Sequence, residues 1–119
     1  MSPADYLTTL AEPTRLRVLF CLAATTLYVS DLVRILDLPQ PTVSRHLRVL
    51  RALGLVQDRR CATRVAYHLT LPAGAQGRMV RGVLHALKTD PAFRADAAAA
   101  RARARAAAPR LPQHPAHAF

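Results

Sequence analysis

The stretch from residue 29 to residue 69 constrains the fold more than any other part of the chain. Apolar residues at helical spacing follow Ser30, a suitable N-cap, and this first predicted helix ends at Leu38-Pro39-Gln40. Pro41 opens a second helix, and Gly54 ends it just past the last turn, where glycine is favoured. One face of the second helix is apolar and comprises Val43, Leu47, Leu50 and Leu53. The sequence therefore predicts two helices joined by a tight turn.

Two segments of alternating apolar and polar residues follow the second helix. They cover residues 55–58 and 64–69, and the residues between them are predicted to form a loop rich in arginine. Helix, turn, helix and hairpin in this order predict a mainly α fold with a small β-hairpin, the winged helix-turn-helix. In such domains the second helix enters the major groove of DNA, and its N-terminal residues face the base edges.

Further helices are predicted on both sides of this stretch. One starts at Ser2-Pro3, a second runs from Thr14 to Ala24, and a third follows the hairpin from Ala73 to Lys88. The apolar face of the helix after the hairpin has nothing left to cover in so small a fold, so it is a candidate dimer interface. That face comprises Met79, Val80, Val83, Leu84 and Leu87.

The chain divides into three predicted parts. Residues 1–90 form a DNA-binding and dimerisation domain, and residues 91–108 form a helix or arm rich in alanine and arginine. Three interpretations of this segment stay open: a helix packed on the dimer, a phosphate-binding arm, or a segment without a role whose alanine and arginine content reflects the base composition of the genome. Residues 109–119 are rich in proline and are expected to be disordered, with His114 and His117 exposed.

The charge of the chain indicates a polyanionic partner. Lysine and arginine total 17 against 7 acidic residues, a formal net charge of +10. Between residues 40 and 64 there are six arginines and a single acid, Asp58. We predict that the second helix reads DNA bases and that the hairpin contacts the backbone or the minor groove. The predicted contacts are Gln40, Thr42, Ser44, Arg45 and Arg48 on the helix, and Arg59, Arg60 and Arg64 on the hairpin. His46 has two readings, a core-edge residue or a further DNA contact.

The two cysteines exclude some classes of protein. Cys21 and Cys61 are far apart and lack CxxC spacing, so neither a disulfide framework nor a zinc finger is indicated, and a reducing cytoplasm is expected.

The sequence shows no apolar run that approaches the ~20 residues needed to span a bilayer, so no membrane partner is expected. Paired carboxylates, Cys-His or Ser-His spacing and a glycine-rich phosphate loop are also absent from the sequence, which argues against an enzyme.

Three runs of sequence together resemble the ArsR/SmtB family of bacterial winged-helix repressors: LAEPTRLRVLFCLAA, DLVRILDLPQPTVSRHLRVLRALGLVQDRR and RVAYHL. The resemblance covers about residues 7 to 88. It implies a homodimer built from the first helix and the helix after the hairpin. It also implies binding to an inverted-repeat operator of double-stranded DNA, and release when an inducer shifts the dimer away from its DNA-competent shape. The alternative is a winged-helix interaction module that does not read DNA sequence.

The resemblance also bears on the inducer. Arsenic-sensing members carry a CVCDL motif where this chain has residues 28–32, which contain neither thiol. The positions of the family's zinc ligands hold Leu71, Ala73, Leu84 and Leu87 here, and His85 is one position off. A thiol-bound metalloid, metal or oxidant remains as a candidate inducer, sensed by Cys21, Cys61 or both. The alternative for Cys21 is a small buried apolar residue, although Arg17 on the same helix could lower the pKa of its thiol. The alternative for Cys61 is a surface thiol with no sensing role.

Overall fold

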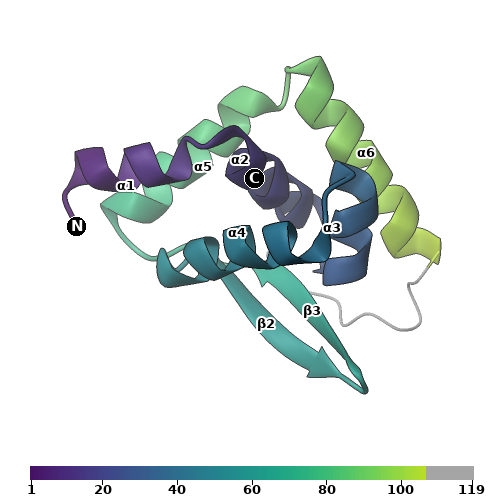
Figure 1. The fold of residues 1–119 in the computed structure, drawn as a ribbon. Helices are drawn as coiled ribbons and strands as arrows, with labels where there is room; N and C mark the ends of the chain where they lie inside the picture. The colour runs from purple at the N-terminus through teal and green to yellow at the C-terminus, as the bar shows by residue number, and fades with distance from the viewer. Residues whose placement is uncertain (107–119) are drawn as a thin grey trace.

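The computed structural model describes residues 1–106, which form a mainly helical fold with a small antiparallel sheet (Figure 1). The order of elements confirms the predicted winged helix-turn-helix. The elements are α1 (Pro3–Leu10), α2 (Pro13–Ala24), β1 (Leu27–Tyr28), α3 (Val29–Leu36), α4 (Gln40–Ala52), β2 (Val56–Cys61), β3 (Arg64–Leu69), α5 (Ala75–Leu87) and α6 (Pro91–Ala106). The predicted disordered tail, with His114 and His117, lies outside the described residues.

Side chains cap the first two helices. The Asp5 amide donates to Ser2 Oγ over 3.1 Å, and Pro3 follows as the first helical residue, as the sequence predicted. Glu12 caps α2, because its carboxylate accepts hydrogen bonds from the amides of Thr14 (3.2 Å) and Arg15 (2.9 Å). A carboxylate at this end also complements the positive end of the helix dipole. The two caps fix where the chain turns between α1 and α2.

The start of α3 differs from the prediction. Ser30 was expected to be the N-cap, but the helix begins at Val29 and Tyr28 occupies the cap position. The Tyr28 amide donates to Asp31 Oδ2 over 2.9 Å, so a carboxylate in the first turn replaces the expected hydroxyl. The second helix, α4, begins one residue before the predicted Pro41, at Gln40, and Gly54 follows its end with a φ of 78°. The helix-turn-helix itself is therefore as predicted.

The hairpin is longer than expected. The ladder of β2 and β3 runs from Val56 opposite Leu69 to Cys61 opposite Arg64, which leaves a turn of Ala62 and Thr63. The predicted arginine-rich loop is therefore wrong, because its residues before Ala62 lie in strand β2. In addition, β1 pairs with β3, which gives the sheet order β1-β3-β2.

The hydrophobic core surrounds α2, which contacts α3, α4, α6 and β3. This explains why α2 is apolar on more than one side. The fully buried leucines include Leu19, Leu22, Leu32, Leu47, Leu50, Leu55 and Leu84. No helix within residues 1–106 combines the length and the apolar character that a membrane crossing requires.

Residues 91–106 form a helix that shares this core. Ala97 and Ala100 of α6 are buried against α2, and the Phe93 ring meets the Phe20 ring edge to face at 5.5 Å. Small alanine side chains let the two helices approach closely. Of the three readings of the arm, the packed helix agrees with this placement, while the division of the chain at residue 90 stays a prediction.

Candidate nucleic-acid interface

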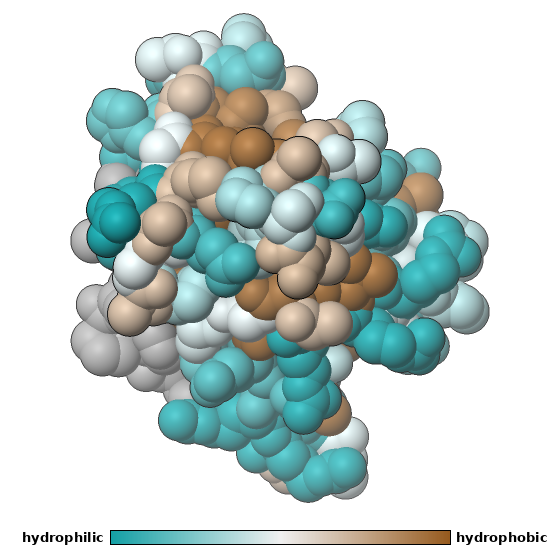
Figure 2. Space-filling model, turned by 90° about the vertical axis from the view of Figure 1, so that its left-hand side faces the viewer, coloured by the Kyte–Doolittle hydropathy of each residue, from teal (hydrophilic) through white to brown (hydrophobic). Residues whose placement is uncertain are grey.

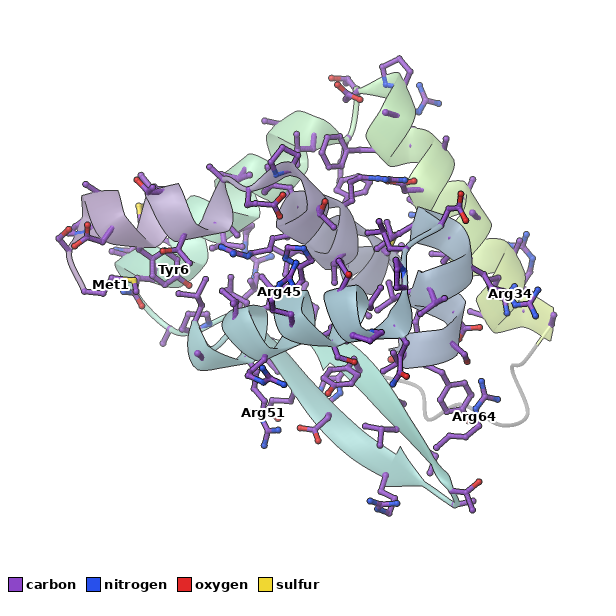
Figure 3. All side chains as sticks on the ribbon, viewed as in Figure 1. Met1, Tyr6, Arg34, Arg45, Arg51 and Arg64 are labelled. Carbon is purple, nitrogen blue, oxygen red and sulfur yellow. The ribbon has the colours of Figure 1, made fainter. Side chains whose placement is uncertain are left out.

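The polar face of α4 is exposed because its apolar face is anchored in the core. Val43, Leu47 and Leu50 are at most 1% exposed and fix the rotation of the helix about its axis. Of the predicted reading residues, Gln40, Arg45 and Arg48 are exposed, and Thr42 and Ser44 are half-buried at the same end. Figure 3 labels Arg45 on α4. The structure thus brings these five residues together on one helix, with three of them open to a ligand.

His46 lies at the edge of the apolar face of α4. Its side chain is buried, and its Nδ1 lies 3.5 Å from Glu12 Oε2, next to the cap of α2. Burial lowers the pKa of His46 more than Glu12 raises it, so the imidazole is neutral at pH 7. Of the two interpretations of His46, the core-edge residue agrees with this burial, and the DNA contact stays a prediction.

The hairpin of β2 and β3, which is the wing of the fold, presents arginines on both of its faces. Arg59 and Arg60 are exposed on β2, and successive strand residues point to opposite faces. At the base of the wing, Arg51 Nη1 lies 3.2 Å from Asp58 Oδ1 and connects the end of α4 to β2. The Arg51 side chain is 62% exposed and that of Asp58 is 32% exposed, so water screens this pair and it contributes little stability. The wing is therefore a basic two-stranded ribbon attached to α4, the helix predicted to read DNA bases.

Arg64 has partners that the sequence did not reveal. Its guanidinium carbon lies 3.6 Å from the centre of the Tyr28 ring, a cation–π contact. Its Nη2 also donates to Ser30 Oγ over 2.6 Å. These contacts hold the Arg64 guanidinium against Tyr28 and the first turn of α3, although the Arg64 backbone is next to the hairpin turn. Tyr28 and Ser30 are 36 and 34 residues away in the chain, so only the antiparallel pairing of β1 with β3 could have indicated them.

Asp31 is a second residue whose contacts the sequence did not predict. Its carboxylate accepts from the Tyr28 amide and, through Oδ1, from Arg103 Nε over 2.8 Å. The side chain of Asp31 is 5% exposed, so a buried carboxylate joins α6 to the start of α3. No sequence signal links two residues this far apart without an alignment.

The candidate sensing thiols have different environments. Cys21 is fully buried, and burial, with a further contribution from Asp96, raises its pKa to about 12. Arg17 lowers the pKa of Cys21, as expected, but by less than burial raises it, and Arg17 is itself paired with Asp96 through two hydrogen bonds of 2.8 and 3.0 Å. Cys61 is half-buried at the end of β2, and both cysteines are free thiols. Within residues 1–106, no group of three or more potential metal ligands comes together.

Comparison with known proteins agrees with this geometry. The family model for "Bacterial regulatory protein, arsR family" matches residues 12–58. The chain is 38% identical over 65 residues to the HTH-type transcriptional repressor SmtB of Mycobacterium tuberculosis, a match that covers 55% of this chain and 48% of that protein. With the arsenical resistance operon repressor of Escherichia coli, it shares 41% identity over 76 residues, which cover 61% and 65% of the two chains. The chain thus spans about half the length of the first curated relatives that it matches.

A solved structure covers more of the chain. The transcriptional repressor BigR from Xylella fastidiosa aligns with a TM-score of 0.58 and 34% sequence identity, over 72% of this chain and 79% of that one. The family model, at residues 12–58, covers α4 and the start of the β2–β3 hairpin. The chain therefore belongs to the ArsR family of bacterial regulatory proteins.

Proposed function

We propose that this protein is a transcriptional repressor that binds a DNA operator by sequence and leaves it when an inducer binds. One observation carries the proposal: α4 exposes Gln40, Arg45 and Arg48 beside a basic wing, while buried residues hold the helix from behind. Related proteins that carry the name repressor support it. DNA is the partner that fits both the shape and the charge of this surface.

The proposal assigns a role to each part of the surface. Arg45 and Arg48 can pair with guanine in a bidentate manner and Gln40 with adenine, each worth about 1–3 kcal/mol of discrimination. Thr42 and Ser44 are suited to phosphates near the start of α4. Arg59 and Arg60 contact backbone or minor groove, and Arg64 serves the backbone beside the first turn of α3. An inverted repeat with two half-sites requires two copies of this surface.

We further propose that the second copy docks on α1 and α5. Leu7 on α1 is 40% exposed, and Met79, Val83 and Leu87 on α5 are half-buried. Figure 2 shows apolar side chains on the side of the molecule where α1 and the start of α5 lie in Figure 1. An apolar surface that a second copy covers would leave both reading helices free.

An electrophoretic shift assay on the operator tests the reading helix. We expect Arg45→Ala to weaken operator binding by about 1–3 kcal/mol and to relax the sequence preference, because a base contact is lost. Arg60→Ala should weaken binding to all DNA about equally, whereas Arg94→Ala, which removes an exposed arginine near the start of α6, should change little. Unchanged operator affinity in Arg45→Ala would contradict the assignment. Equal affinity of the wild type for operator and random DNA would favour the interaction module.

The inducer part of the proposal is tested at the accessible thiol. Cys61 is half-buried at the wing, whereas Cys21 is fully buried and neutral, so a thiol-reactive inducer would act on Cys61. Cys61→Ser should then abolish release of the operator by a trivalent arsenical or an oxidant and leave DNA binding intact. Release that persists in Cys61→Ser would point to a site without a thiol.

A further inference from the structure

The C-terminal end of α6 lies against the part of the molecule that joins the wing to the helix-turn-helix. Arg103 pairs with Asp31 in the first turn of α3, and Ala104 packs on the small cluster of Tyr28 and Ala66. In Figure 1 this end of α6 lies on the same side of the molecule as the wing tip, while α1 lies on the opposite side. The end of α6 is thus next to the proposed DNA surface and far from the proposed dimer surface.

This end of α6 carries exposed positive charge. Arg101 and Arg105 are exposed and one turn apart, so they lie on one face of the helix, and Arg103 turns away from them toward Asp31. Arg34 on α3 is also exposed, and Figure 3 shows it beside the end of α6. Asp31, the carboxylate that joins α6 to α3, is buried and already paired with Arg103. The charge of Arg34, Arg101 and Arg105 is therefore open to an external anion.

Hydrogen bonds link the end of α6 to the wing. Arg64 donates to Ser30, Ser30 precedes Asp31, and Asp31 accepts from Arg103, so one connected set of residues runs from β3 to α6. Arginines in the last turn of a helix also complement the helix dipole, which accounts for Arg103 and Arg105. It does not account for Arg101, which lies before the last turn, or for Arg34 on another helix. Several arginines on one surface repel one another unless an anion binds there.

We propose that Arg101 and Arg105, together with Arg34, bind backbone phosphates of the DNA that flanks each half-site. This inference rests on the proposed function and extends its surface from the wing to α6. In a dimer joined through α1 and α5, the two α6 ends are at the outer flanks, where only longer DNA reaches them. The contact is with phosphates and reads no bases, so it adds affinity and salt dependence without adding sequence preference.

The test compares the wild type with Arg101→Gln/Arg105→Gln on two duplexes. One duplex ends at the operator, and the other is longer by about one helical turn on each side. On the long duplex we expect the double variant to lose at least about tenfold in affinity, and its salt slope to fall by roughly 0.9 for each lost contact. On the short duplex the two proteins should bind alike. Arg94→Gln, which removes one exposed arginine from the other end of α6, is the matched control and should bind like the wild type.

Two further measurements separate a loss of positive charge from a loss of helical structure. Circular dichroism reports whether the double variant keeps α6, and Arg101→Lys/Arg105→Lys, which keeps both charges, should keep most of the affinity. Equal affinity and slope for the Gln variant and the wild type on the long duplex would overturn the inference. So would an equal loss on both duplexes, or a Lys variant as weak as the Gln variant. Failure of the wild type itself to bind the operator would instead overturn the proposed function.

Discussion

At the scale of single residues, burial decides which titratable side chains can change charge near neutral pH. Cys21 and His46 are both buried, and both stay neutral because loss of solvation penalises the charged form. Burial raises the pKa of Cys21 to about 12 and lowers the pKa of His46. Arg17 and Glu12 act in the opposite direction, but neither overcomes burial.

The two thiols should therefore differ in reactivity. We expect one thiol per chain, that of Cys61, to react quickly with Ellman's reagent in the native protein at neutral pH, because Cys61 is half-buried whereas Cys21 is fully buried. Cys21 should react only after denaturant is added. Cys61→Ser should remove the fast reaction, and Cys21→Ser should leave it intact. A fast reaction that survives in Cys61→Ser would show that Cys21 becomes accessible in the native state.

His46 should make the stability of the protein depend on pH. Its folded pKa lies below the ordinary value of 6.5, so below that pH the unfolded chain binds a proton that the folded chain does not. The free energy of unfolding should fall as the pH is lowered through about 6.5, and His46→Gln should flatten this part of the curve. Urea titrations between about pH 8 and 5.5 measure it, with the exposed His85→Gln as control.

Glu12 acts in a different pH window. Burial raises its pKa, and the hydrogen bonds from the Arg15 and Thr14 amides lower it, with the result below the usual 4.5. Its stabilising effect is present above that value and is lost as the pH falls through the folded pKa. A slope near pH 6 that persists unchanged in His46→Gln would therefore contradict the role of His46 without involving Glu12.

At the scale of elements, the sequence predicted the helices well because their signals are local. Ser2-Pro3 and Gly54 mark helix ends within one turn, and the apolar spacing of α4 shows which of its faces is buried and hence that Arg45 points away from the core. The strands were harder. β1 has two residues, too few to show alternation, and β2 projects from the body with four consecutive exposed residues, so no covered face imposes a pattern.

The partners across elements could not be predicted at all. The contacts of Arg64 with Ser30 and of Arg103 with Asp31 depend on how α3, β3 and α6 come together, not on spacing within any one of them. Polar residues of this kind have no periodicity that marks them as buried or paired. This is also why the packing of α6 stayed one of three readings.

The contact between α2 and α6 predicts that a larger side chain on the buried face of α6 destabilises the fold. Ala100 is fully buried between the two helices, so Ala100→Leu should overpack the contact and destabilise the fold by about 1–3 kcal/mol. Ala99→Leu adds the same atoms on the exposed face of α6 and should change stability by less than about 0.5 kcal/mol. Urea denaturation measures both. Equal stability of the two variants would mean that α6 does not pack on α2 as described.

In the whole molecule, the proposed dimer surface, the reading helix α4 and the basic surface of the wing and the end of α6 follow one another across the protein. α1 is on one side, the reading helix is in the middle, and the wing and the end of α6 are on the other side (Figure 1). Two copies joined through α1 and α5 would place two reading helices between two basic flanks. A repressor of this kind needs its dimer for affinity, because each copy alone reaches only half of an inverted repeat.

The dimer surface therefore predicts a coupled loss. Leu7→Glu places a charge at the most exposed leucine of α1, where burial by a second copy would remove its solvation, so the protein should become monomeric. Sedimentation should then report a mass near 13.0 kDa instead of about twice that value. Operator affinity should fall by at least about tenfold, because one half-site is lost. Thr8→Glu adds the same charge to an exposed neighbour on α1 and should stay dimeric and bind normally. A Leu7→Glu protein that stays dimeric would place the interface elsewhere, and a monomer with full operator affinity would separate DNA binding from dimerisation.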